Sequence, residues 1–283
     1  MSDTGAMGQQ QKAFWNSEAT RRWVTEQASI DRLMAAVTEA ALTAAAPKLG
    51  EAVLDIGCGT GSTLLRLAKA IGPEGSALGV DISAQQLDLA RQRIADSGMT
   101  NARVALDDAA THAFPPAEFD LAFSRYGVMF FPDPIAAFRN IRRGMKPGGR
   151  LALAVFRPAA DNPWTSGPLA AIRHLVTFPP PPGPEEPGQF SWGDPTRVRR
   201  ILEGAGFLNV ALTPFDTPFT LGANAAEAAE FAMFIGQGAR LLHGVTDSVR
   251  DAARTALQAF LKPREGPDGV RLSAGLWLVS GQA

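Results

Sequence analysis

The feature that most constrains this 283-residue chain is the stretch V-L-D-I-G-C-G-T-G, from Val53 to Gly61. An apolar run with one acid, Asp55, breaks into glycines at every second position, and apolar residues at helical spacing follow. This order predicts a buried strand, a tight turn and a helix that begins beside the turn. Glycines in such a turn permit positive φ and let a ligand approach the backbone closely. We therefore expect a ligand site here.

Three kinds of site share a glycine-rich turn between strand and helix, and two of them fit this sequence poorly. A nicotinamide dinucleotide site needs Gly or Ala three residues after its second glycine, where this chain has Ser62. A phosphate loop ends in Gly-Lys-Ser/Thr, but the first lysine after the turn is Lys69. An acid two residues before the first glycine, with alternating glycines after it, instead resembles motif I of the class I S-adenosylmethionine-dependent methyltransferases.

Composition narrows the function further. A 46% hydrophobic fraction fits a globular protein with a large core, and a net charge of −1 without a basic run argues against a nucleic-acid partner. The single cysteine, Cys58, excludes an internal disulfide and a cysteine metal site, so we expect no metal. The chain also lacks a signal-peptide pattern and a membrane-length apolar stretch. We therefore expect a cytoplasmic protein with no membrane partner.

Strands and helices alternate between residues 48 and 157, and each connection is long enough for a parallel crossover. We predict an α/β fold: a Rossmann-like, doubly wound, seven-stranded, mostly parallel sheet with helices on both faces. By the resemblance, residues 48–157 form the S-adenosylmethionine-binding core. The predicted later strands are 208–212 and 274–280, and a short helix is predicted at about 169–176.

Other segments flank this core. The predicted division is a disordered tail (1–12), an N-terminal helical lid (13–47), a Pro-rich strap (158–195), and the rest of the sheet (196–283) with a helical lid insertion at about 223–262. Residues 12–46 read as one helical stretch and the insertion as two helices. Ser83 and Gln86 have the spacing of a capping box for the helix after the second strand.

The resemblance implies S-adenosyl-L-methionine as methyl donor and S-adenosyl-L-homocysteine as product. Asp81 closes the second strand 24 residues after Gly57, near the interval at which an acid binds a ribose diol. The segment D-D-A-A-T-H-A-F resembles the one that borders the adenine in this family. The predicted cofactor-binding residues are Asp55, Gly57, Cys58, Gly59, Gly61, Asp81, Ile82, Asp108, Ala109, Ser124 and Trp23.

The patterns F-W-N…R-R-W-V and S-R-Y-G-V-M-F-F resemble small-molecule methyltransferases of the ubiquinone and menaquinone group, and D-P-T-R-V-R-R-I-L-E-G-A-G-F resembles the type 11 methyltransferases. A small, partly apolar acceptor is expected, methylated on O, S, N or C by in-line displacement that depends on positioning. The predicted acceptor-binding residues are Trp15, Arg125, Met129, Phe130, Phe178, Phe190 and Trp192. No motif anchors a base, and the weak candidates are His112, Asp133 and His174.

Two other functions stay open from the sequence. One is a methyltransferase-like protein that binds the cofactor without transferring a methyl group, because the glycine turn and Asp81 predict binding and not turnover. The other is a nicotinamide-dependent oxidoreductase, against which Ser62 argues.

Overall fold

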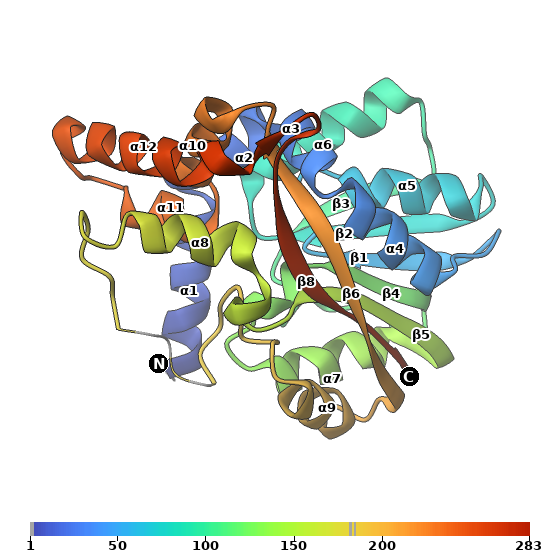
Figure 1. The fold of residues 1–283 in the computed structure, drawn as a ribbon. Coiled ribbons are helices and arrows are strands. Elements are labelled where there is room, and N and C mark those ends of the chain that lie inside the picture. The colour runs from blue at the N-terminus through green and yellow to red at the C-terminus, as the bar shows by residue number, and fades with distance from the viewer. Residues whose placement is uncertain (1–2, 181–182, 184) are drawn as a thin grey trace.

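The computed structural model of the protein describes residues 3–180, 183 and 185–283 (Figure 1). Three prolines of the predicted strap, Pro181, Pro182 and Pro184, lie outside the described residues, as does the start of the predicted tail.

One twisted sheet runs through the molecule in the order β3-β2-β1-β4-β5-β8-β6, and the short β7 pairs with β8. Strands β1 to β5 are parallel to one another, whereas β8 runs antiparallel to both β5 and β6. The predicted mostly parallel α/β sheet is therefore confirmed. The strands are β1 (Ala52–Ile56), β2 (Ser76–Asp81), β3 (Ala102–Leu106), β4 (Phe119–Arg125), β5 (Met145–Phe156), β6 (Leu208–Gly222), β7 (Glu265–Gly266) and β8 (Gly269–Gln282).

Helices cover both faces of the sheet, as predicted (Figure 1). One face carries α4 (Ala35–Ala45), α5 (Ser62–Ile71) and α6 (Ala84–Ser97), and the other carries α7 (Pro134–Gly144) and α9 (Pro195–Gly204). The reason is visible in α5, where Leu64, Leu67 and Ile71 are fully buried while the lysine and the last alanine are exposed. Burial of such stripes joins the helices and the sheet into one hydrophobic core.

The N-terminal prediction is wrong in two respects. Residues 3–12 are helical within α1 (Asp3–Trp15), where a disordered tail was expected. The predicted continuous helix of residues 12–46 is instead interrupted after α1 by η1 (Glu18–Thr20), α2 (Arg22–Thr25) and α3 (Gln27–Leu33). Two hydroxyls explain the first break: Ser17 Oγ donates to the Phe14 carbonyl (2.7 Å) and Thr20 Oγ1 to the Trp15 carbonyl (3.0 Å). Such side-chain bonds compete with helical backbone bonds.

The predicted lid at 13–47 consequently divides into two parts. Helix α4 packs on β4, β5 and β8, so it belongs to the layer of helices on one face of the sheet. Only the segment that contains Trp15 and Trp23 borders the junction of β2 and α6. A lid role therefore remains a prediction for that segment alone.

The insertion between β6 and β8 contains three helices, not the two predicted: α10 (Ala225–Phe234), α11 (Gly236–Leu241) and α12 (Asp247–Leu261). The extra break between helices falls at Gly236, whose φ of +56° does not fit a continuous α-helix. These helices gather with α8 (Pro163–Ala171) and α1 at the left of Figure 1. Helix α8 begins six residues before the predicted start, because Pro163 occupies its first turn and supplies a preset φ.

Strands β6 and β8 are much longer than predicted and pair from Leu208↔Gln282 to Gly222↔Val270. The predicted strand of residues 208–212 ends before Pro214 and Pro218, which β6 includes. Strand β6 lies at the edge of the sheet, where a missing backbone N–H costs no ladder bond on the open side. The edge position of β6 therefore allows a strand where the local sequence, with its two prolines, disfavours one.

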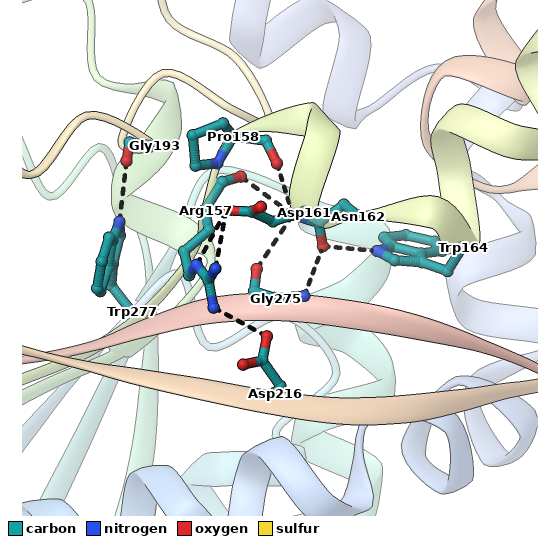
Figure 2. Close-up of polar contacts among 9 residues, drawn as sticks. All are labelled: Arg157, Pro158, Asp161, Asn162, Trp164, Gly193, Asp216, Gly275 and Trp277. Carbon is teal, nitrogen blue, oxygen red and sulfur yellow. Dashed lines mark hydrogen bonds and ion pairs between the residues drawn. The ribbon is translucent and has the colours of Figure 1, made fainter.

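A buried polar cluster fastens the start of the strap to β8 (Figure 2). Asn162 is fully buried, and its Nδ2 donates to the carbonyls of Arg157, Pro158 and Gly275, each at 3.1 Å. Its Oδ1 accepts from the Gly275 amide and from Trp164 Nε1, also at 3.1 Å. Every polar atom of this amide is thus satisfied inside the protein, as a buried polar group requires. We call this cluster the Asn162 clamp.

The Arg157 side chain extends the same cluster outward to β6. Its guanidinium donates to Asp161 (3.0 Å) and to Asp216 (2.8 Å), and it lies 5.4 Å from the Trp277 ring (Figure 2). Trp277 Nε1 in turn donates to the carbonyl of Gly193 at the far end of the strap (2.9 Å). Both ends of the strap are therefore fixed to the antiparallel strands.

Candidate cofactor and acceptor site

The turn after β1 is a backbone cradle that requires glycine. Gly57, Gly59 and Gly61 have φ of +69°, +53° and +80°, a region that side-chain-bearing residues rarely adopt. A Cβ on Gly57 would lie 2.7 Å from the Cα of Gly127, and one on Gly59 would lie 2.9 Å from Gln86 Oε1. Cys58 between them is buried, with its sulfur packed against Gly79 of β2.

Asp55 lies beneath this turn with half of its carboxylate unpaired. The side chain is fully buried, and Thr63 Oγ1 at the start of α5 donates to its Oδ2 (2.6 Å). Its Oδ1 is buried and has no hydrogen-bond partner among the described residues. Burial raises the pKa of Asp55 to about 7, although the Thr63 hydroxyl and the charge of Arg125 act in the opposite direction. The free oxygen would be satisfied by a cationic ligand.

Asp81, at the end of β2, is oriented by two backbone amides. Ser83 N donates to Oδ1 and Gly59 N to Oδ2, each at 2.8 Å. Burial raises the pKa of Asp81, and these two amide bonds limit the rise. Each carboxylate oxygen accepts a single bond here and retains capacity for a hydroxyl donor. The predicted ribose acid and the glycine turn are thus brought together.

The N-terminal segment is bonded to the residues that follow Asp81. Ser83 Oγ donates to the Trp15 carbonyl (2.8 Å), and Asn16 Nδ2 donates to the Ile82 carbonyl (2.9 Å). Asn16 Oδ1 accepts from the Ala84 amide (2.9 Å) and so caps α6 from a distant part of the chain. The capping box predicted from Ser83 and Gln86 is therefore wrong, because the Ser83 hydroxyl makes no bond to its own helix.

The aromatic residues of the predicted lid contact one another beside these bonds. The Trp15 ring contacts Trp23 edge to face at 5.8 Å and Phe130 at 5.5 Å between ring centroids. Phe130 belongs to η2 (Gly127–Phe130), which follows β4. Two cation–π pairs link the same segment to the insertion, since Arg240 lies 3.9 Å from the Phe14 ring and Arg22 lies 5.1 Å from Phe234.

The loop after β3 holds the predicted adenine residues. Asp108 is half-buried, with Oδ1 bound by the Ala110 amide (2.9 Å), and the buried Ala109 offers its carbonyl to Asn140 Nδ2 (3.2 Å). His112 lies in this loop, with Nδ1 2.8 Å from Asp107 Oδ2. That hydrogen bond lowers the pKa of Asp107. This hydrogen bond holds His112 at the predicted adenine end.

Two of the predicted ligand contacts are buried in the core. Ser124 is 0% exposed, and its hydroxyl donates to the Ile56 carbonyl (2.7 Å), so it ties β4 to β1. Trp192 is 1% exposed and packs on Phe138 of α7, with 5.4 Å between ring centroids. Strand register and α7 packing thus place both side chains inside the protein, and their roles as cofactor and acceptor contacts stay predictions.

Three other candidates are also engaged elsewhere. Asp133 caps α7 by accepting from the Ala136 amide (3.0 Å), which is a structural task. His174 is exposed beyond the end of α8, and Phe178 lies 5.4 Å from the Arg173 guanidinium. None of these contacts connects them to the glycine turn. Asp133 and His174 are therefore not supported as bases.

Arg125, at the end of β4, is directed toward the N-terminal helices. Its Nη1 donates to Thr38 Oγ1 of α4 (2.5 Å). Burial lowers the pKa of Arg125, and the neighbouring charges of Asp31 and Asp55 partly oppose this. Its charge thus lies near the cradle, and its acceptor-binding role stays a prediction.

The strap joins η2 on the other side of the cradle. Gly188 N and Ser191 Oγ both bond the Met129 carbonyl, at 3.0 and 2.9 Å. This places Phe190 against Phe156 at the end of β5, with ring centroids 6.0 Å apart. The predicted neighbours Met129, Phe130 and Phe190 are therefore brought together, although the Met129 side chain is buried.

Sequence reasoning missed Tyr126, which lies between Arg125 and Gly127. It is the one tyrosine of the chain. Its backbone has φ of +72°, and its ring stacks on Phe156 at 4.4 Å. The sequence signal that could have identified Tyr126 is its position directly after β4, which ends beside the cradle.

Among residues 3–180, 183 and 185–283, no group of three His, Cys, Asp or Glu residues could hold a metal ion. Within the same described part of the chain, no helix has the length and apolarity needed to cross a membrane.

Comparison with known proteins agrees with this geometry. Residues 53–149 match a family model described as a methyltransferase domain. The chain is 38% identical over 113 residues to aklanonic acid methyltransferase of Streptomyces sp. (strain C5). This alignment covers 39% of this chain and 51% of the relative. It is 31% identical over 172 residues to nocamycin O-methyltransferase of Saccharothrix syringae, covering 58% and 61%. The chain thus spans about half to three fifths of the length of these relatives.

The fold is also similar to that of a putative methyltransferase from Bacillus halodurans C-125. That crystal structure has 19% sequence identity and a TM-score of 0.56, and the alignment covers 87% of this chain and 97% of the other. This likeness concerns the fold. The matched domain, the glycine cradle and the order of the sheet agree with the resemblance to the class I S-adenosylmethionine-dependent methyltransferases, and the domain match covers residues 53–149.

Proposed function

We propose that the protein binds S-adenosylmethionine at the turn after β1 and transfers its methyl group to a small, partly apolar acceptor. The observation that carries the proposal is the unpaired Asp55 oxygen. It lies beneath a glycine turn where a Cβ on Gly57 or Gly59 would take up the space open to a ligand. An amino acid ammonium matches that buried anion, and the ribose diol matches the free lone pairs of Asp81. When bound, S-adenosylmethionine supplies a methyl group on a positively charged sulfur.

The residues of the site act by binding and orientation. Gly57 and Gly59 let the ligand approach the backbone closely, and Asp81 fixes the position of the ligand beside them. Trp15, Phe130 and Phe190 border the approach from the N-terminal segment and the strap. Apolar side chains there would exclude water, and the positioning of an acceptor beside the methyl group would supply much of the rate enhancement.

The relatives support a small-molecule acceptor. Their names assign them methylation of aklanonic acid and O-methylation associated with nocamycin. We extend to this chain only the class, a small organic molecule, with no nucleic acid, membrane or metal in the reaction and with the cytoplasm as its location. His112 is held at the predicted adenine end, so no general base is part of the proposal.

The test is parallel calorimetric titration of the purified protein with S-adenosylmethionine, S-adenosylhomocysteine and NAD. Binding of the first two alone is the expected result, followed by homocysteine-product release in a screen of phenols, thiols and amines. Binding of NAD alone would reject the proposal in favour of a nicotinamide enzyme. Binding of the first two without turnover of any acceptor would favour a cofactor-binding protein that transfers no methyl group.

A further inference from the structure

Tyr126 occupies strained backbone beside the cradle. Its φ of +72° is rare for an aromatic residue, since the left-handed region favours glycine. The next residue, Gly127, packs so closely on the turn that a Cβ there would lie 2.8 Å from the Gly57 Cα. Tyr126 is therefore one residue away from the contact between β4 and the cradle. Strain of this kind persists only where the surroundings hold it, and it clusters at ligand sites.

The Tyr126 ring is part of a packed aromatic group. It stacks on Phe156 with an interplanar angle of 6°, and Phe156 contacts Trp164 (5.5 Å) and Phe190 (6.0 Å). These four residues, which we call the aromatic wall, come from the ends of β4 and β5, from α8 and from the strap. Trp164 is itself held by the Asn162 clamp. The wall is thus fixed on several sides.

The Tyr126 hydroxyl is the one polar group that the aromatic wall leaves unsatisfied in the described part of the chain. The residue is 9% exposed, and its hydroxyl oxygen is buried without a hydrogen-bond partner among the described residues. Burial raises the pKa of Tyr126, so the phenol is a protonated donor at neutral pH. A buried donor without a partner is costly, and a ligand oxygen that accepts its hydrogen bond would recover that cost.

We propose that Tyr126 is an acceptor-binding residue whose hydroxyl donates to an oxygen of the methyl acceptor, a small molecule that bears a phenol or carbonyl oxygen. This inference rests on the proposed methyltransferase function. The stack on Phe156 fixes the phenol ring, and its single unsatisfied donor favours an oxygen on the acceptor. Tyr126 orients the acceptor and keeps its proton throughout.

The experiment uses two probes of similar size, 1-naphthol and 1-methylnaphthalene, with the full chain saturated by S-adenosylhomocysteine. Tyr126→Phe keeps the ring and removes the donor. We expect this variant to bind 1-naphthol ~10-fold more weakly and 1-methylnaphthalene within about twofold of the parent protein. Because the chain has one tyrosine, 3-fluorotyrosine labelling gives a single fluorine resonance, and 1-naphthol alone should shift it strongly.

Each alternative result has a defined meaning. Equal effects on both probes, with normal S-adenosylhomocysteine binding, would show that Tyr126 only packs, and would overturn this inference while the proposed function stands. No binding of 1-naphthol at millimolar concentration would overturn the acceptor class in the same way. Failure of the parent protein to bind S-adenosylhomocysteine would remove both the proposed function and this inference.

Discussion

The two halves of the site differ in how they are built. The cofactor half of the proposed site, at the ends of β1 and β2, consists of the backbone of three glycines and of two aspartate carboxylates that amides and a hydroxyl orient. The acceptor half, at the ends of β4 and β5, consists of aromatic side chains held by the strap and by the Asn162 clamp. A change in the first half should therefore act on the cofactor, and a change in the second on stability and on the acceptor.

The largest effect is expected at the point where the two halves touch. Gly57→Ala places a methyl group 2.7 Å from the Gly127 backbone at a φ of +69°, so we expect a loss of about 3 kcal/mol or more in unfolding free energy. Gly98→Ala is the matched control, with φ of +68° and open space around it, and should lose only about 1 kcal/mol. Urea unfolding measures both. Equal losses would show that backbone strain, and not contact between the halves, sets the requirement.

The next effect isolates the acceptor half. Asn162→Ala removes five hydrogen bonds and leaves buried partners unpaired, so we expect a loss of about 2–4 kcal/mol in unfolding free energy. Affinity for S-adenosylhomocysteine should stay within about twofold at a temperature where the variant is folded. Gln92→Ala, on the exposed surface of α6, is the control for substitution alone. A large loss of cofactor affinity in Asn162→Ala would mean that the halves are not separable.

The reverse test uses the cofactor half. Asp81→Ala removes the carboxylate that the turn orients, and we expect cofactor binding to weaken by about 1–3 kcal/mol through loss of charge-assisted bonds. Asp88→Ala changes an exposed aspartate on α6 and should bind the cofactor normally. Calorimetry gives both affinities. Unchanged affinity in a folded Asp81→Ala protein would remove Asp81 from the ribose role.

The remaining effect is a pH dependence centred on Asp55. The pKa is raised from 3.8 to about 7, so the stability that Asp55 contributes to the free protein is present below pH 3.8 and is lost as pH rises toward 7. A cationic ligand needs the ionised form, so affinity for S-adenosylhomocysteine should increase about tenfold per pH unit up to about pH 7 and then level off.

Asp55→Asn keeps an acceptor for Thr63 and removes the titration. Calorimetric titrations between pH 5.5 and 8 should show a flat, weak affinity for this variant and a rising one for the parent protein. Parallel pH profiles in the two proteins would show that Asp55 does not face the charged part of the ligand.

The cofactor half was predictable because its signals are local. The order of strand, glycine turn and helix fixes where Asp55 lies, and the interval to Asp81 places the second acid at the adjacent strand end. Consecutive strands joined by a crossover are usually neighbours in the sheet. The acceptor half gave no such signal, since Phe156 and Phe190 are 34 positions apart in sequence and meet only through the strap.

The contacts that the sequence did not predict also depend on residues distant in sequence. Ser124 and Trp192 have residue types suited to a ligand site, yet the register of β4 and the packing of α7 place both in the core. Ser83 has the sequence of a helix cap, but its hydroxyl bonds the Trp15 carbonyl from a segment 68 positions earlier. Such contacts depend on which elements become neighbours, and side-chain type does not encode that.

The sequence by itself determined the α/β fold, the glycine cradle and the acids that serve it, because backbone conformation and strand order follow from local pattern. Tertiary structure alone decided which aromatic residues are core and which border the site, how far β6 extends, and that the Tyr126 hydroxyl has no partner among the described residues. Burial and hydrogen-bond satisfaction are properties of the assembled neighbours, and they exist only after the whole chain has packed.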